Sequence, residues 1–349
     1  MRVAIKRRTL GLLVLLAGCG GVGGVGYLAR AAWSEARILL RRQPIDGLLA
    51  RPDLEPAFRE RLELVVAARD FAAGPLGLRV GDSYTTFAEV EGDATVYVVS
   101  AARRDRLAAY TWWYPLVGRL PYRGFFARPA AEAAAQALAA EELDADVRPA
   151  VAFSTLGWFA DPLLSSAAAA PPVAVVDTVL HELFHATLYL PGEATFNESA
   201  ATFVGLRGAV AFFCAGPHAD AGRCEEARRR WERTRARGRI YGRLAARLRR
   251  LYAARPGAAV RERTRARLAG AAAEALARRG LGERSELLPP NNARLLGDLL
   301  YLTDLDRFAM LVPSDADLGP AVADLVAAAR GAADPFAALR LLASRREGR

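Results

Sequence analysis

Apolar residues recur at helical spacing in the middle of the chain and predict a pair of helices. The first pattern runs from Val173 to Tyr189, and the Pro191-Gly192 pair ends it. A second helical pattern begins at Asn197. Because the connection is short, we expect the second helix to fold back antiparallel to the first.

The rest of the chain is predicted to be mainly helical, with a small amount of β-structure. Runs of β-branched and aromatic residues predict strands at residues 95–100, 110–114 and 147–154. Apolar stripes predict helices at residues 27–71, 130–143, 223–284, 295–301, 316–329 and 335–344. No internal repeat or second composition boundary divides the sequence. We therefore expect an α+β, predominantly helical fold with a helical C-terminal half, in a single domain of residues 19–349.

The first predicted helix carries the motif His181-Glu182-Leu183-Phe184-His185. Histidines four residues apart lie on one face of a helix, so their imidazoles converge on one point. This motif on a helix supplies two zinc ligands, and its glutamate is the general base for a water molecule. The chain has only three histidines in 349 residues, so a chance match is rare. We expect zinc ligands at the two histidines and a catalytic base at Glu182.

A catalytic zinc site takes a third protein ligand and keeps a fourth position open. The return of the second helix would turn Glu198 toward His181 and His185. A zinc ion in such a site lowers the pKa of a water molecule and polarises the scissile carbonyl. Glu182 would take the water proton and pass it to the leaving amine.

Around this motif the sequence is similar to a known family. The segment from His181 to Thr202, which includes Tyr189, Gly192 and Asn197-Glu-Ser, resembles the core of the predicted bacterial aminopeptidases. That family consists of envelope lipoproteins placed among the zincin-type metallopeptidases. Further matches lie at residues 71–78, 111–124, 153–162 and 291–301, so the resemblance spans nearly the whole chain.

The resemblance implies a zincin-like peptidase with a small sheet beside the metal helix. In zincins the edge strand of that sheet binds an extended peptide by main-chain pairing. Residues 151–159 are placed in the sequence to be this edge. We therefore expect substrate-binding contacts at Ser154, Thr155, Leu156 and Gly157.

Two further roles need side chains outside the motif. A donor to the developing oxyanion is expected at Tyr301, which the resemblance includes, with His218 and Tyr241 as weaker candidates. Restriction to a free N-terminus needs an acidic group near the metal, and Glu193 and Asp161 are the candidates. Endopeptidase action also stays open at this point.

The positive charge of the chain is local. The formal net charge is +10, yet residues 223–284 contain 20 arginines and 6 glutamates, a local excess of 14. This predicted helical hairpin is either a solvated arm or a contact with anionic lipid headgroups. No aromatic stacking pattern accompanies the arginines, so we expect no nucleic-acid partner.

The N-terminus has the pattern of a bacterial lipoprotein signal. Four basic residues precede an apolar run at residues 10–16, and the sequence Leu-Ala-Gly before Cys19 resembles a lipobox. We expect a signal peptide at residues 1–18 and lipidation of Cys19. The alternative is an uncleaved anchor to about residue 29, because residues 9–29 carry no charge. Both interpretations of the N-terminus place the rest of the chain in the cell envelope, membrane-anchored and facing the periplasm or exterior.

The other two cysteines, Cys214 and Cys224, are ten residues apart. In that compartment a disulfide between them would persist, and two unpaired thiols are the alternative. Together these features predict a membrane-anchored zinc peptidase of the envelope that hydrolyses peptides, with aminopeptidase action implied by the resemblance. The alternative is an envelope lipoprotein with a structural zinc site and an interaction role. Glu182 favours the enzyme, because a structural site has no use for a carboxylate beside its ligand.

Overall fold

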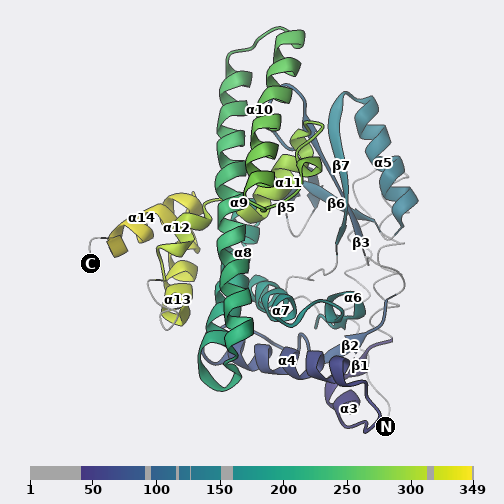
Figure 1. Ribbon diagram of the computed structural model, residues 1–349, viewed down its shortest axis with the longest axis vertical. Coiled ribbons are helices and arrows are strands. Elements are labelled where there is room, and N and C mark those ends of the chain that lie inside the picture. The colour runs from purple at the N-terminus through teal and green to yellow at the C-terminus, as the bar shows by residue number, and fades with distance from the viewer. Residues whose placement is uncertain are drawn as a thin grey trace.

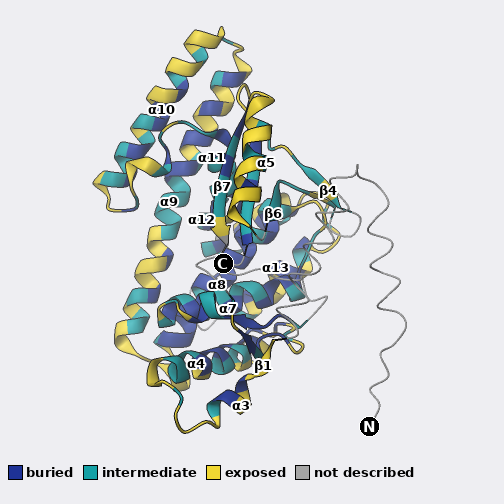
Figure 2. Cartoon of the chain, turned by 90° about the vertical axis from the view of Figure 1, so that its right-hand side faces the viewer, coloured by how far each residue is buried: buried dark blue, intermediate teal, exposed yellow. Residues whose placement is uncertain are grey.

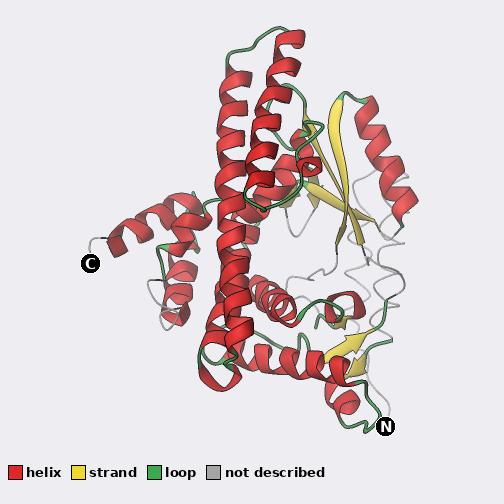
Figure 3. Cartoon of the chain, in the orientation of Figure 1, coloured by secondary structure: helices red, strands yellow, loops and turns green. Residues whose placement is uncertain are grey.

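The computed structural model describes residues 41–90, 96–114, 118–125, 127–150, 160–312 and 318–347. These residues form an α+β structure in which helices predominate and the strands make three small sheets (Figure 1, Figure 3). The predicted fold class is confirmed at this level.

Two packed helices form the centre of the molecule. They are α7 (Pro172–Thr187) and α8 (Ala194–Cys214), and both are apolar on most of their surface. Glycine in α8 allows the helices to approach closely, because a Cβ at Gly208 would lie 2.5 Å from Cδ1 of Leu180. Helix α4 (Pro56–Ala73) also packs against α7.

The main sheet has three antiparallel strands in the order β6-β3-β7. They are β3 (Val96–Arg103), β6 (Tyr122–Phe125) and β7 (Leu143–Ala150). Two helices pack on this sheet, α5 (Arg128–Ala140) and α11 (Asn292–Leu302). Since α11 also packs on α8, it links the sheet to the central helices.

Strand β7 begins at Leu143, whereas the apolar pattern predicts that a helix continues to that residue. Its buried positions include Asp144 and Asp146, which form ion pairs with Arg265 and Arg148 respectively. A strand with acidic residues at buried positions lacks the apolar alternation that marks a strand. This is why the sequence pattern misses its first half.

Two smaller sheets complete the β-structure. One joins β1 (Gln43–Pro44), β2 (Thr86–Ala88) and β8 (Leu163–Leu164), with the short helices α3 (Ile45–Leu49) and α6 (Ser165–Ala168) beside it. The other pairs β4 (Trp112–Tyr114) with β5 (Gly118–Leu120). The predicted strand at residues 110–114 therefore belongs to this two-stranded sheet and not to the main sheet.

The arginine-rich segment forms two long helices that lie side by side in Figure 1. They are α9 (Ala221–Ala253) and α10 (Ala258–Arg278), flanked by the 3₁₀ helices η1 (Gly216–His218) and η2 (Arg284–Glu286). The side chain of Asp220 caps the start of α9 by accepting a hydrogen bond from the backbone N–H of Arg223 at 2.8 Å. The chain then ends with α12 (Leu305–Ala309), α13 (Leu318–Ala329) and α14 (Pro335–Glu347).

Among the described residues, no helix is both long enough and apolar enough to cross a membrane. The predicted signal or anchor at residues 1–29 lies outside them.

Candidate metal centre

The first part of the site is the C-terminal half of α7. Pro172 occupies the first helical position, where its missing N–H is no loss. His181 and His185 follow one turn apart on this helix, and their ring centroids are 5.0 Å apart with an angle of 81° between the planes. The helical spacing therefore brings the two imidazoles together, as the motif predicts.

Glu198, in the second turn of α8, completes a cluster of three side chains. Its Oε2 lies 3.3 Å from Nε2 of His181 and 3.6 Å from Nε2 of His185. The Glu198 side chain is only 13% exposed, and these two histidines are its ion-pair partners among the described residues. One ligand atom from each residue lies within 4.8 Å of the other two. The structure thus brings the predicted ligand set to one place.

The turn between α7 and α8 determines where Glu198 lies. Asn197 is buried, its Oδ1 accepts a hydrogen bond from Leu190 N at 3.0 Å, and its Nδ2 donates to Leu190 O at 2.9 Å. Gly192 has a φ of +85°, which residues with a side chain rarely adopt. Because the turn is closed on the residue before Glu198, it fixes which face of α8 meets α7.

A second carboxylate lies beside the first histidine. Asp177, one turn before His181 on α7, accepts a hydrogen bond on Oδ2 from Nε of Arg230 in α9 at 2.9 Å. Gly205 of α8 makes room for it, since a Cβ there would lie 2.6 Å from Asp177 Oδ1 and 3.1 Å from His181 Cβ. Close packing of three helices therefore positions Asp177 and His181 together.

The charges of the cluster shift the pKa of each member. Burial lowers the pKa of His181, but the hydrogen bond that it donates to Glu198 and the nearby carboxylates outweigh burial and raise this pKa from 6.5 to about 9. Burial would raise the pKa of Glu198, yet the two histidines hold it well below 4.5. The cluster is thus built to stabilise positive charge, whether a proton or a metal cation carries it.

Glu182 is half-buried beside the cluster. Desolvation raises its pKa above 4.5, the two histidines oppose this shift, and the charges of Glu198 and Asp161 add to it. Asp161 is itself buried. Burial and the charges of Glu182 and Asp161 together raise the pKa of Tyr84. Asp161, Tyr84 and Glu182 therefore share one electrostatic environment.

Tyr301 reaches the cluster from α11. Its ring is stacked on that of His181, with 6.1 Å between centroids and 30° between planes. The charge of Glu198, together with desolvation, raises the pKa of Tyr301 well above 10, so the hydroxyl stays protonated although the side chain is 42% exposed. Burial and the charge of Glu198 also raise the pKa values of Tyr122 and Tyr189.

Ser199 holds α11 against α8 at this point. Its hydroxyl donates to Leu300 O at 2.7 Å and accepts a hydrogen bond from Thr303 N at 3.1 Å. Because Ser199 follows Glu198 and Leu300 precedes Tyr301, these bonds join the segments that carry the two functional side chains. The sequence pattern misses this role, and its only signal is the position of Ser199 within the Asn-Glu-Ser segment.

The rest of α11 is fastened to the sheet. Asn291 caps the helix by accepting a hydrogen bond from Arg294 N at 3.0 Å, and its amide donates to the β7 backbone at 2.8 Å. Arg148 of β7 donates to Asp298 Oδ1 at 2.5 Å and to Arg294 O at 2.9 Å. Asp298 lies three residues before Tyr301, so the sheet helps to place the helix that presents Tyr301.

The donor set of the cluster fits a zinc ion. Two imidazole nitrogens and one carboxylate oxygen converge, and no fourth candidate ligand joins them among the described residues. Two histidines and one carboxylate are a ligand set that catalytic zinc sites use when they leave a coordination position for water or substrate.

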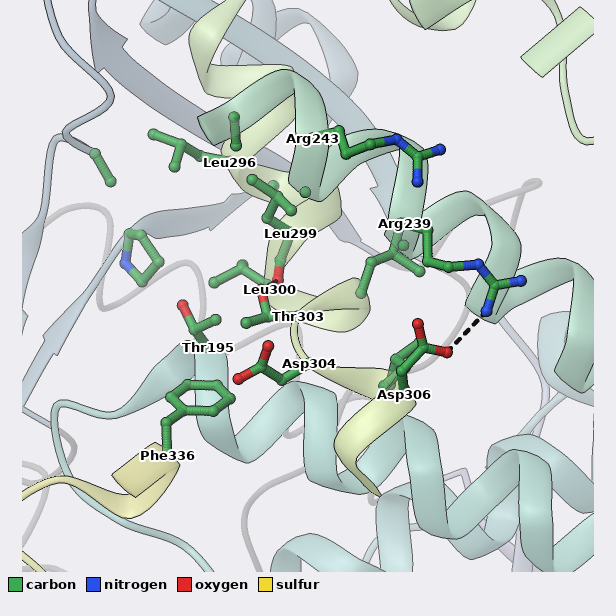
Figure 4. A pocket seen from close by; sticks show the side chains of 18 of the residues that line it. Thr195, Arg239, Arg243, Leu296, Leu299, Leu300, Thr303, Asp304, Asp306 and Phe336 are labelled. Atoms are coloured by element: carbon green, nitrogen blue, oxygen red, sulfur yellow. Dashed lines mark hydrogen bonds and ion pairs between the residues drawn. The ribbon is translucent and has the colours of Figure 1, made fainter. Parts of the chain in front are cut away.

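Other predicted site residues lie elsewhere. Cys19 and residues 154–157 fall outside the described residues. Glu193 lines a cavity of about 1140 Å³ whose described lining does not include the three residues of the cluster. Figure 4 shows this cavity between α9, α11 and α12, with Arg239 paired to Asp306 in its wall at 2.8 Å.

The cysteines and the weaker oxyanion candidates are also placed. Cys214 and Cys224 form a disulfide that joins the end of α8 to the start of α9. The hydroxyl of Tyr241 donates to Glu286 at 3.2 Å, and the ring of His218 stacks on Phe212. Neither Tyr241 nor His218 belongs to the cluster.

Comparison with known proteins adds the family. A family model described as "Putative aminopeptidase" matches residues 26–319, which is most of the chain and includes the whole cluster and α11. No curated protein and no solved structure matches the chain. The chain therefore belongs to the aminopeptidase-like family described as "Putative aminopeptidase".

Proposed function

We propose that the protein is a zinc-dependent peptidase of the HExxH zincin type that acts as an aminopeptidase. The observation that carries this proposal is the convergence of His181, His185 and Glu198, with Glu182 beside them. Membership of the family supports peptidase action at a coarser level.

The residues of the cluster would divide the work as follows. A zinc ion held by the three ligands would supply Lewis acidity and a lowered pKa for a water molecule. Glu182, whose pKa is raised, would accept the proton of the attacking water and later return it to the leaving amine. Asp177 and Arg230 hold the helix face that carries His181 and so keep the first ligand in place.

Tyr301 would stabilise the transition state. Its hydroxyl remains protonated at all working pH values, and its ring lies over His181. A hydroxyl in this position donates a hydrogen bond to the oxygen of the scissile carbonyl as negative charge develops there.

Aminopeptidase action requires a group that binds the free α-ammonium of the substrate. Asp161 is better placed than Glu193, because its charge acts on Glu182 whereas Glu193 lines a cavity that the cluster does not share. An extended peptide would pair with residues 154–157. In support, these residues follow β7, which is an edge strand of the described main sheet.

We further propose that the enzyme is a membrane-anchored protein of the cell envelope. The lipobox-like sequence at Cys19 supports this location. The disulfide between Cys214 and Cys224 is in keeping with an oxidising compartment.

A purely structural zinc site would be expected to have four protein ligands. The described residues supply three, and a carboxylate with a raised pKa lies next to one of them. Both observations favour a catalytic site over a structural one.

The test compares the wild-type protein with Glu182→Gln, with Glu193→Gln as a matched control outside the cluster. Zinc content is measured by mass spectrometry, and cleavage is measured on a mixed peptide library. We expect one zinc per chain in all three proteins, with cleavage lost only in Glu182→Gln. Absence of zinc, or equal cleavage by wild type and Glu182→Gln, would overturn the proposal.

A further inference from the structure

The α9–α10 hairpin ends in a turn at one extremity of the molecule. Helix α9 stops at Ala253 and α10 begins at Ala258, and Figure 1 shows the turn projecting beyond the sheet and the other helices. At a rise of about 1.5 Å per residue, Arg243 and Arg267 lie roughly 15 Å from the turn. We call residues 243–267 the hairpin tip.

The hairpin tip has an extreme charge composition. It contains nine arginines and a single acidic residue, Glu262. Two of these arginines form ion pairs, Arg261 with Glu262 and the buried Arg265 with both Glu262 and Asp144. The other seven are exposed and have no ion-pair partner in the described part of the chain. They are Arg243, Arg247, Arg249, Arg250, Arg255, Arg263 and Arg267.

The arginines at the base of the hairpin differ from those at the tip. Arg230 pairs with Asp177. Both Arg235 and Arg239 pair with Asp306. Arginines at the base therefore hold the hairpin to the rest of the fold. At the tip only the buried Arg265 makes such a contact, with Asp144 of β7. The seven exposed arginines of the tip have no ion-pair partner among the described residues, and their mutual repulsion opposes folding. The fold leaves the charge of the tip free for a partner outside the chain.

The exposed arginines of the tip lie in rows along α9 and α10. Arg243, Arg247 and Arg250 recur four and three residues apart on α9, and Arg263 and Arg267 are one turn apart on α10. The opposite side of α9 is buried through Leu244, Leu248 and Tyr252, and Figure 2 shows exposed positions along both helices. Each helix thus packs with one face and presents arginine on another.

An apolar side chain accompanies the arginines. Val260, in the first turn of α10, is 48% exposed and is one of the few large apolar side chains of the described residues to be so. Arginine binds phosphate groups in a bidentate manner, and an apolar side chain among arginines enters the headgroup region of a bilayer. By contrast, the only aromatic residue of the tip, Tyr252, is buried and cannot stack on a base.

We propose that the hairpin tip docks on the surface of a bilayer that contains anionic phospholipids. Charge complementarity and the exposed Val260 favour this partner over a nucleic acid. The docking surface is independent of the metal centre, so it goes beyond the proposed peptidase function and neither depends on the other.

The test uses the full chain and flotation with vesicles of phosphatidylcholine alone or with added phosphatidylglycerol. The tip variant replaces Arg247, Arg250, Arg263 and Arg267 with Gln. The control variant replaces four exposed arginines away from the tip with Gln and therefore has the same net charge. They are Arg233, Arg278, Arg279 and Arg345. Because both proteins keep the N-terminal segment, its contribution to binding cancels in the comparison.

We expect phosphatidylglycerol to increase binding of the wild type and the control, and high salt to remove the increase. Each arginine lost from the tip should weaken this anionic component about fivefold. Val260→Ser, made in the wild-type background, should weaken binding to the phosphatidylglycerol vesicles without any change in net charge. Melting curves that match the wild type would show that the tip variant is folded.

Two results would overturn the proposal. One is a tip variant that keeps the full phosphatidylglycerol-dependent increase. The other is tip-dependent binding of a single-stranded oligonucleotide at physiological salt without any response to phosphatidylglycerol, which would identify a nucleic-acid surface instead. Neither result bears on zinc content or peptide cleavage, so failure here is distinct from failure of the proposed function.

Discussion

The ring of Tyr301 lies over the imidazole of His181, although the two residues are 120 positions apart in the sequence. Ser199 joins α8, which carries Glu198, to α11, which carries Tyr301, through its hydrogen bonds to Leu300 O and Thr303 N. The stacked pair is therefore a product of helix packing, and it gives the site a protonated hydroxyl next to a proposed metal ligand.

Replacing Tyr301 with Phe tests that hydroxyl. The ring and its stacking on His181 remain, so zinc content should not change. Loss of one donor to the developing oxyanion should lower kcat about 100-fold with little change in KM. Steady-state kinetics on a peptide substrate measure this, and Tyr241→Phe, which alters a hydroxyl bonded to Glu286, is the control. A full-rate Tyr301→Phe enzyme would remove Tyr301 from the mechanism.

Replacing Gly205 with Ala tests the close contact between α7 and α8. The new Cβ would lie 2.6 Å from Asp177 Oδ1 and 3.1 Å from His181 Cβ, so one of them must move. We expect a loss of about 1–3 kcal/mol in the free energy of unfolding and weaker zinc binding. Urea denaturation and zinc titration measure the two effects.

Gly242→Ala is the matched control for that substitution. Gly242 lies inside α9, and a Cβ there meets nothing within 4 Å. Because alanine has the higher helix propensity, this variant should be more stable by about 0.5–1 kcal/mol, with unchanged zinc binding. Equal behaviour of the two variants would show that the α7–α8 contact is not tight.

Removing the metal should make stability depend on pH in a defined direction. The folded-state pKa of His181 is about 9, above its usual 6.5, so bound proton favours the folded state. This stabilisation is complete below pH 6.5 and is lost as the pH rises through 9. The pKa of Glu198 is lowered, so its contribution is present above pH 4.5 and lost in acid.

Chelator-treated protein should therefore be most stable between about pH 5 and 6 and weaken by a few kcal/mol toward pH 9. Urea unfolding at several pH values measures this. His181→Gln should flatten the alkaline decline. Zinc should reverse the trend, because it binds the neutral imidazole and competes with the proton. An alkaline decline that is unaffected by His181→Gln would contradict the assignment.

Replacing Asp161 with Asn tests recognition of the free amino group. A charge-assisted hydrogen bond to the α-ammonium contributes about 1.5–3 kcal/mol, so kcat/KM for a peptide with a free N-terminus should fall about 10- to 100-fold. For the same peptide after N-acetylation, which removes the ammonium charge, kcat/KM should be the same in the wild type and in Asp161→Asn. Glu193→Gln serves as the control and should leave both rates unchanged. Equal losses on the two peptides would give Asp161 a structural role.

Much of the helical structure follows from local pattern. The helices around the metal cluster, the arginine-rich hairpin and the last two helices appear close to where apolar periodicity predicts them. The first half of β7 is missed because Asp144 and Asp146 occupy buried positions. Arg265 reaches Asp144 and Arg294 reaches Asp146 from distant segments, in addition to the neighbouring Arg148, and no local pattern contains the two distant partners.

The sequence by itself determined the part of the site that depends on spacing along one helix. His181, Glu182 and His185 lie on adjacent turns of α7, and a short turn returns Glu198 to them. Only the tertiary structure decided that Tyr301 and Asp161 join this environment while Glu193 does not. Those positions depend on how α8, α11 and the strands pack, and packing is set by contacts between residues that are far apart in the chain.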